Sequence, residues 1–378
     1  MKKNLVVFFC FCAFFILFSS ISLALETRAI DDIRKKDVLN DTDQKAVGAF
    51  IEAGIEELFN TEDFSAVSSL RQAIVSRKAG LNETSAQQYK TAFDSTAVES
   101  FTKAFGRLDK VQNQAQAFSI RLNLLLLISE LSDARLVNLA IDNIKSKSSA
   151  IRYAAAKCLS SPDIIKQLNS ATSADIQLAQ KAISALNEIM KNETDGSVLV
   201  EIITFTSEIN GNESENLILE IAKDRISKYE NATVSNDYIE AAVLKALYAK
   251  SLKASSDSVK NDLMAAFGQL YSYVIQQYAI KDANLSETRK GQVVDVIVGV
   301  ENDLVSQILG SKAGSLKKAI ERDDMAALMT AHDSLLGSSN GKGMIASAVD
   351  FYYSIEGENK VYMPKKLVTP AKEPEQQQ

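Results

Sequence analysis

Residue types that commonly carry catalysis or bind metals are scarce in this chain, and His332 is its single histidine. One histidine excludes every metal site and nucleophilic triad that needs two imidazoles, and the sequence shows no evident partner for a one-histidine scheme. His332 lies in a stretch with helical spacing of apolar residues, from Leu328 to Leu335. We therefore expect a structural or surface role for it.

Two short motifs resemble catalytic or phosphate-binding sequences without meeting their requirements. The segment from Gly337 to Gly343 is one residue short between glycines for a phosphate loop, lacks Ser or Thr after its lysine, and follows a predicted helix instead of a strand. A flexible turn is expected there. Ser315 and Lys318 have the Ser-x-x-Lys spacing, but no companion motif accompanies them. No catalytic residue is predicted.

Acidic residues occur in groups, but none of the groups has the pattern of a cation site. The Glu56–Glu57 and Asp323–Asp324 pairs are sequence neighbours, so on a helix their carboxylates point in different directions. Residues 37–43 are rich in aspartate yet lack the glycine and the terminal glutamate of a calcium loop. The sequence predicts no metal and no cofactor.

The N-terminus has the three parts of a secretory signal peptide. Lys2 and Lys3 precede an apolar run, and small residues lead to Ala24. We expect residues 1–24 to be removed, so that the mature chain begins at Leu25 in the periplasm or outside the cell. The alternative is an uncleaved anchor, because residues 5–25 approach the roughly 20 apolar residues that span a bilayer.

Removal of this leader would leave Cys158 as the only cysteine, so no intrachain disulfide can form. Cys158 lies at the helical spacing of the apolar residues around it and is expected to be a small buried side chain. A reactive thiol is the alternative, with only Lys157 nearby to support it. The net charge of −6, which loss of two lysines makes more negative, argues against nucleic acid as a partner.

Apolar residues recur at intervals of three and four along most of the chain, and a single proline, Pro162, interrupts residues 25–363. With the cap residues, this pattern predicts helices near residues 43–59, 63–78, 85–106, 112–131, 134–145, 149–160, 162–168, 173–191, 196–209, 213–229, 236–252, 256–280, 286–310 and 313–336. The fold class is therefore all-α. The five consecutive apolar residues 124–128 indicate a helix covered on more than one side.

The chain is expected to divide into four regions. Residues 1–24 are the signal peptide, residues 25–254 are a repeat array, and residues 255–356 are a C-terminal section with longer helices. Residues 357–378, rich in Pro, Lys, Glu and Gln, are expected to be a disordered tail.

The centre of the chain repeats itself. An Ile-Arg pair begins an apolar block at Ile120 and again at Ile151, and each block is followed by an aspartate that opens a short amphipathic run. Residues 149–159 resemble the second helix of a HEAT repeat, and residues 175–186 look like a further copy with glutamine in the arginine position. The step between copies is shorter than in that family, so a generic armadillo-like helical fold fits as well.

This resemblance implies an irregular α-solenoid of stacked antiparallel helix pairs. Proteins of this class bind other molecules, and the resemblance assigns no catalytic residues to this chain. We expect an exported, non-enzymatic scaffold that binds a protein, a peptide or an envelope polymer. An all-helical hydrolase or lyase acting on envelope polymers is the alternative, and a membrane-tethered structural component is a third hypothesis. The candidate partner-binding ridge consists of polar residues beside the apolar stripes, namely Arg121, Arg152, Lys157, Gln177 and Lys181.

Overall fold

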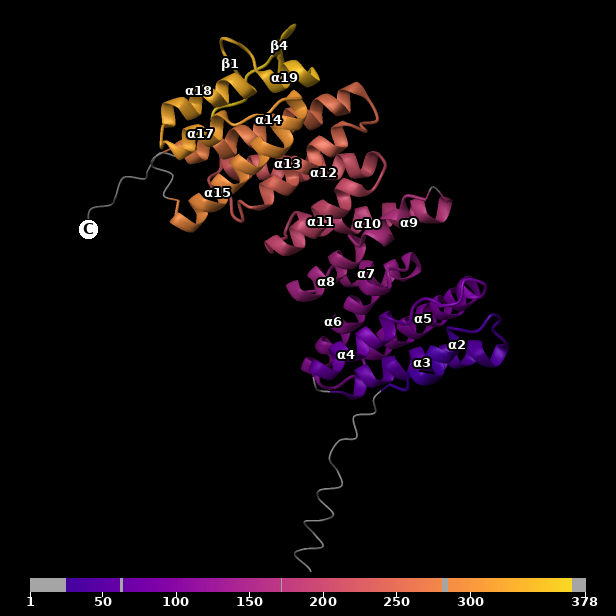
Figure 1. The fold of residues 1–378 in the computed structure, drawn as a ribbon. Helices are drawn as coiled ribbons and strands as arrows, with labels where there is room; N and C mark the ends of the chain where they lie inside the picture. The colour runs from indigo at the N-terminus through magenta and orange to yellow at the C-terminus, as the bar shows by residue number, and fades with distance from the viewer. Residues whose placement is uncertain (1–24, 62–63, 171, 281–284, 369–378) are drawn as a thin grey trace, which may run out of the picture. The chain divides into compact units, whose positions relative to one another are not determined.

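The computed structural model describes residues 25–61, 64–170, 172–280 and 285–368. Over these residues the protein is mostly helical, with two short β-hairpins, which confirms the all-α class (Figure 1). The predicted signal peptide, with Lys2, Lys3 and Ala24, and residues 369–378 of the predicted tail lie outside the described residues. No helix within the described ranges is long and apolar enough to cross a membrane.

The chain divides into two units after Leu139, within helix α7 (Val137–Asn143), and each unit is described by itself. The first unit contains α2 (Arg28–Ile33), α3 (Asp41–Asn60), α4 (Phe64–Val75), α5 (Ala86–Leu108), α6 (Gln114–Leu131) and the short 3-10 helix η2 (Ala134–Leu136). Helix α3 packs against α2, α4, α5 and α6. Aromatic side chains of α5 fill the space between these helices, with Tyr89, Phe93 and Phe101 at most 1% exposed.

Helix α6 confirms the expectation drawn from its run of five apolar residues. Leu124, Leu125, Leu127 and Ile128 have no solvent exposure, and α3, α4 and α5 all contact the helix. Asn113 begins α6 with a side-chain oxygen that accepts hydrogen bonds from the first free backbone amides. Several sides of this helix are therefore covered within the first unit.

The second unit begins with a series of paired helices. These are α8 (Ser149–Leu159), α9 (Pro162–Leu168), α10 (Ser173–Met190), α11 (Gly196–Glu208), α12 (Asn212–Glu230), α13 (Ile239–Ser251) and α14 (Asp257–Ala279). Helices α8, α11 and α13 contact one another in turn, as do α10, α12 and α14 (Figure 1). Helix α14 also packs against α13, and nearly every residue from Leu263 to Gln276 is buried.

The remainder of the unit surrounds the far side of α14. It consists of α15 (Glu287–Val300), the π-helix η3 (Glu301–Val305), α16 (Ser306–Leu309), α17 (Ser315–Glu321), α18 (Met325–Leu336), the hairpin β1 (Gly337–Ser338) with β2 (Gly341–Lys342), α19 (Met344–Val349), and the hairpin β3 (Ser354–Glu356) with β4 (Asn359–Val361). Helices α15 and α18 contact α14, and α17 packs on both. The turn expected at residues 337–343 is therefore the first of the two antiparallel hairpins.

Of the two long helices predicted near the C-terminus, one runs continuously through a π-helical stretch and the other is interrupted. The one expected at 286–310 contains η3, which begins at Glu301, a side chain with no solvent exposure. The one expected at 313–336 ends in a turn where Asp323 has a positive φ of 51°, and Asp324 then caps α18 by accepting the amide of Ala327. The interruption involves a turn and a side-chain cap that apolar periodicity does not encode.

The predicted disordered tail is wrong for residues 357–368. Strand β4 pairs with β3, and the amide of Tyr353 donates to the carbonyl of Val361 at 2.8 Å. Residues 363–368, named here the C-terminal strap, then lie against α14, where two glutamine side chains bind their backbone. Composition indicated a segment without a core of its own, but the strap is ordered by bonds to a helix formed earlier in the chain.

Candidate functional site

The five residues of the candidate ridge have different environments. Arg121 belongs to α6 in the first unit, whereas the other four belong to the second unit. The Arg121 side chain is 35% exposed, and its guanidinium lies 3.8 Å from the carboxylate of Asp109. Arg121 therefore has a surface carboxylate partner within its own unit.

Arg152 is an internal clamp instead of the exposed ridge residue that the sequence predicts. Its Nε lies 2.6 Å from Glu193 Oε2, its second terminal nitrogen 2.9 Å from Oε1, and the carbonyl of Ser146 accepts a further bond at 2.9 Å. The side chain of Glu193 is only 1% exposed. Burial opposes ionisation of Glu193, but hydrogen bonds from Arg152 and from two backbone amides outweigh it and hold its pKa below the usual value.

Lys157 projects from the same helix with its charge partly compensated. Its Nζ lies 3.4 Å from Glu201 Oε1 and 5.9 Å from the centre of the Tyr153 ring. The attraction of Glu201 raises the pKa of Lys157, so the ammonium stays protonated at neutral pH. The side chain is 47% exposed and remains open to a partner from one side.

Gln177 and Lys181 are exposed on α10, the helix that borders a groove in the second unit. We name this hollow of about 350 Å³ the α10 groove. Its lining residues come from α9, α10 and the α11–α12 turn, and they are Leu168, Asn169, Ile176, Ala179, Gln180, Ile183, Asn210, Gly211 and Glu213. The sequence placed two ridge residues on α10, but neither of them lines the groove, which the sequence did not identify.

The α10 groove combines an apolar surface with a polar rim held in place. Ile176 is 45% exposed, although its spacing from Ala179 and Ile183 puts it on the buried stripe of α10. On the rim, the side-chain nitrogen of Gln180 donates to Glu213 Oε1 at 2.9 Å. Glu213 is the only charged residue of the lining, so the groove offers an apolar contact beside one carboxylate.

Asn169 fixes the far wall of the groove. Its side-chain nitrogen donates to the carbonyl of Glu208 at 2.9 Å, and its oxygen accepts from the amide of Asn210 at 2.9 Å. Gly211 begins α12 with a φ of +113°, a conformation that favours glycine. The turn that forms this wall is therefore held by hydrogen bonds to Asn169.

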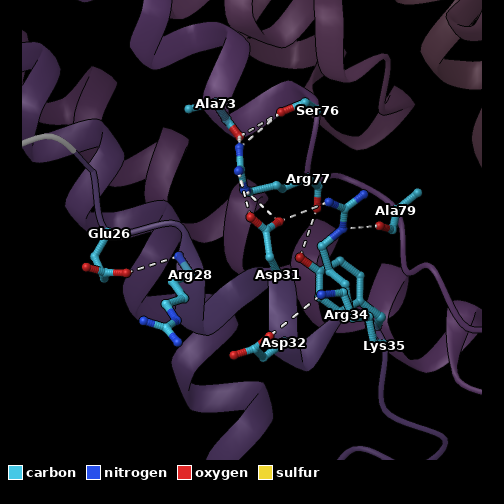
Figure 2. Close-up of polar contacts among 11 residues, drawn as sticks. Glu26, Arg28, Asp31, Asp32, Arg34, Lys35, Ala73, Ser76, Arg77 and Ala79 are labelled. Carbon is cyan, nitrogen blue, oxygen red and sulfur yellow. Dashed lines mark hydrogen bonds and ion pairs between the residues drawn. The ribbon is translucent and has the colours of Figure 1, made fainter.

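A polar cluster in the first unit has a structural role. Figure 2 shows the carboxylate of Asp31 between the guanidinium groups of Arg77 and Arg34, with closest distances of 2.8 Å and 3.2 Å. Hydrogen bonding to Arg77 outweighs burial and keeps the pKa of Asp31 low. Arg34 Nε also donates to the backbone carbonyl of Ala79 at 2.8 Å. The hydroxyl of Tyr89 donates to the backbone carbonyl of Arg77, also at 2.8 Å. The cluster fastens α2 to the segment after α4.

A larger hollow of about 530 Å³ lies between α3 and α5 in the first unit. Lys103, Lys110 and Glu52 line it, together with an ion pair between Arg107 and Glu56. The Arg107 guanidinium also lies over the Phe59 ring, 4.4 Å from its centre. The charges that line this hollow are of both signs and partly paired, so the hollow would select among partner peptides less than the α10 groove does.

Cys158 is buried, as the sequence predicts. Its side chain has no solvent exposure, and burial raises the pKa of its thiol to about 12. A thiol that stays protonated at neutral pH is a poor nucleophile. Cys158 therefore contributes to packing.

His332 is buried in the second unit, which favours the structural side of its predicted role. The structure also gives His332 partners that the sequence did not reveal, because Ser272 is hydrogen-bonded to its Nε2 and Asp333 to its Nδ1. Within the described ranges, no group of three or more His, Cys, Asp or Glu side chains is placed to hold a metal ion. No family model, curated protein or solved structure matches this chain.

Proposed function

We propose that this protein is an exported α-solenoid scaffold of HEAT-like type that binds a peptide segment of a partner protein in the α10 groove. The consecutive contacts of α8, α11 and α13, and of α10, α12 and α14, support stacked helix pairs in the second unit. We retain residues 25–254 as the repeat array and residues 255–356 as its C-terminal section.

The observation that carries the binding role is the exposed side chain of Ile176 beside Glu213. Covering a side chain of this size contributes about 1.5–3 kcal/mol when it is fully buried. Glu213 is the carboxylate of the groove lining and accepts a hydrogen bond from Gln180, so it favours a lysine or arginine next to the apolar anchor. The partner segment is therefore apolar and basic, in keeping with the net negative charge of the chain.

Selection of displayed random peptides on the full chain tests this role. We expect the tightest binders to combine an apolar residue with Lys or Arg. Ile176→Asp should weaken their binding at least about tenfold, equal to 1.4 kcal/mol, because it puts a carboxylate on the apolar surface. Glu213→Gln should reduce the salt dependence of affinity. Fluorescence anisotropy with labelled peptides gives both results.

Ile355→Asp is the matched control, since Ile355 is 57% exposed on β3 and does not line the groove. It should leave peptide affinity unchanged. Equal affinity of the selected peptides for the native chain and for Ile176→Asp would show that the groove is not the binding site.

The export proposal has a separate test. Intact-mass spectrometry of the protein from its producing cells should show Leu25 as the first residue if the leader is cleaved. Retention of Met1 would instead support the membrane-tethered alternative, in which residues 5–25 act as an anchor.

A further inference from the structure

One face of α14 carries a row of buried polar side chains that the proposed binding role does not use. Gln269, Ser272 and Gln276 follow one another at helical spacing and are each at most 8% exposed. Helix α18 packs on α14 and brings His332 to Ser272, while the C-terminal strap binds the two glutamines. A buried serine and histidine thus meet beneath a terminal segment.

The hydrogen bonds at His332 have the arrangement of a nucleophilic triad. Ser272 Oγ lies 2.8 Å from His332 Nε2, and Asp333 Oδ1 lies 2.8 Å from His332 Nδ1. Gln276 Nε2 donates to Ser272 Oγ at 2.7 Å, so the serine hydrogen is directed to Nε2. The ring hydrogen then sits on Nδ1 and is donated to Asp333, which is the tautomer that a general base needs.

The imidazole is also in the protonation state of a base. Burial lowers the pKa of His332, and the opposing effect of Asp333 does not cancel this. Asp333 is half exposed, whereas Ser272 and His332 are covered. Ser272 and His332 are therefore uncharged and shielded from solvent, while the Asp333 carboxylate that positions the imidazole is partly exposed.

The strap places a peptide carbonyl beside this pair. The carbonyl oxygen of Lys365 accepts from Gln269 Nε2 and from Gln276 Nε2, each at 3.2 Å. Gln276 Nε2 is the same nitrogen that donates to Ser272 Oγ. Two amide donors thus hold an acyl oxygen one hydrogen bond away from the serine, as an oxyanion site does.

The rest of the strap is bound in the manner of an extended peptide. The amide of Lys365 donates to Gln269 Oε1 and the amide of Leu367 to Gln276 Oε1, both at 2.8 Å. Pro364 is buried, while the side chain of Lys365 is exposed. Recognition runs through alternate backbone groups, so an unrelated extended peptide could make the same bonds.

From this geometry we propose that Ser272, His332 and Asp333 form an acyl-transfer site for peptide-like substrates, which the C-terminal strap occupies and inhibits. Gln269 and Gln276 bind the substrate carbonyl in place of that of Lys365. This activity goes beyond the peptide-binding role of the α10 groove and does not depend on it.

The reaction follows from these positions. Ser272 Oγ attacks the acyl carbon while its proton passes to His332 Nε2, and the carbonyl electron pair moves to the oxygen held by the two glutamines. The bond to the leaving nitrogen or oxygen then breaks, and that atom takes the proton from His332. Water adds to the acyl-serine with His332 as base, the acyl–Oγ bond breaks, and Ser272 recovers its proton as the carboxylic acid leaves.

The strap inhibits by occupying these groups. While Lys365 is bound, its carbonyl oxygen occupies the two glutamine donors that would hold a substrate carbonyl. Release of the strap would free both glutamine donors for a substrate carbonyl.

A fluorophosphonate probe, which reacts with activated serines, tests the proposal on the full chain. The Lys365→Pro/Leu367→Pro variant removes both amide donors of the strap. We expect its labelling to exceed that of the native protein at least about tenfold, with the label on the peptide containing Ser272. Adding Ser272→Ala should abolish it.

Val368→Pro is the matched control, because Val368 is 74% exposed and the change places a proline at the end of the strap. It should label as weakly as the native chain. Leu367→Pro alone, which removes one amide donor, provides a milder release if the double variant does not fold. Asp333→Asn in the released background should lower the labelling rate at least about tenfold without unfolding the protein, because Asp333 positions the imidazole.

Two outcomes would overturn the proposal. One is a released variant that keeps the native unfolding temperature, exchanges its backbone amide hydrogens in residues 363–368 faster than the native chain, and yet shows no label dependent on Ser272. The other is labelling at Ser272 that Asp333→Asn leaves unchanged, because a serine that is merely exposed does not need the positioning carboxylate.

Discussion

Replacing Glu240 with alanine should lower the free energy of unfolding by about 3–5 kcal/mol, the usual cost of breaking a buried ion pair. Glu240 on α13 and Arg225 on α12 are both at most 2% exposed, and Arg225 Nε lies 2.8 Å from Glu240 Oε1. The change would leave the guanidinium buried with a bond to the carbonyl of Ser235 at 2.7 Å. Urea unfolding at pH 7, followed by circular dichroism, measures the loss.

The paired replacement Arg225→Met with Glu240→Leu should recover most of that loss. Burial raises the pKa of Glu240 to about 7 despite the attraction of Arg225, so forming the pair in the interior carries a large desolvation cost. Two apolar side chains of similar size avoid this cost. A double variant as unstable as Glu240→Ala would show that the pair contributes a large net stabilisation.

An exposed pair on the same helix serves as the control. Glu220 and Lys223 lie 3.3 Å apart on α12, with both side chains more than half exposed. Because water screens such a pair, Glu220→Ala should produce little measurable change in stability. An effect comparable to that of Glu240→Ala would indicate that α12 itself, and not burial of the charge, sets the loss.

Arg152→Ala is expected to lower stability by about 1.5–3 kcal/mol at pH 7, the range for hydrogen bonds to charged groups. It removes a two-bond contact from the buried carboxylate of Glu193, which would keep only the amides of Thr194 and Asp195 at 2.9 Å. Thermal unfolding across pH is the measurement. Lys145→Ala, which breaks the exposed Lys145–Glu188 pair, should have little effect.

The pH dependence of this loss has a definite sign. The pKa of Glu193 in the folded protein lies below the ordinary glutamate value of 4.5, so its contribution is present above about pH 4.5 and is lost as pH falls through the folded value. The difference between native protein and Arg152→Ala should therefore shrink in acid, and Glu193→Gln should flatten the acid limb. A difference that stays constant down to pH 2 would contradict the ion-pair explanation.

The same variant separates stability from recognition. The sequence predicted Arg152 as a ridge residue, whereas its guanidinium is bound to Glu193 and to backbone carbonyls. We therefore expect peptide binding to the α10 groove to survive Arg152→Ala at temperatures where the variant is folded. Loss of binding without loss of stability would restore Arg152 to the ridge.

Helix positions could be predicted well because the helical period of apolar residues is a local signal. The helices expected near residues 149–160, 162–168 and 173–191 are α8, α9 and α10, with ends that agree within one residue. The short helices α2 and α19 were not predicted, since six residues give too little periodicity. The strap was taken for a disordered tail because it has no core of its own.

The candidate sites required the tertiary structure. Ile176 has the spacing of a core residue in the sequence, yet its side chain is 45% exposed in the structure. His332 had no visible partner because Ser272 is 60 residues away in the chain, and Lys365 binds Gln269 across 96 residues. The neighbouring Asp333 could not be recognised as a partner until the side-chain directions were known.

By itself, therefore, the sequence determined the helical class, the approximate helix ends and the burial of residues such as Cys158. Spacing along one helix identifies the face that must be covered, because an apolar stripe cannot remain in water. The tertiary structure alone decided which polar groups meet, as with Arg152 and Glu193 across 41 residues. Such pairs depend on distances of a few ångströms between separate helices, and apolar periodicity does not specify them.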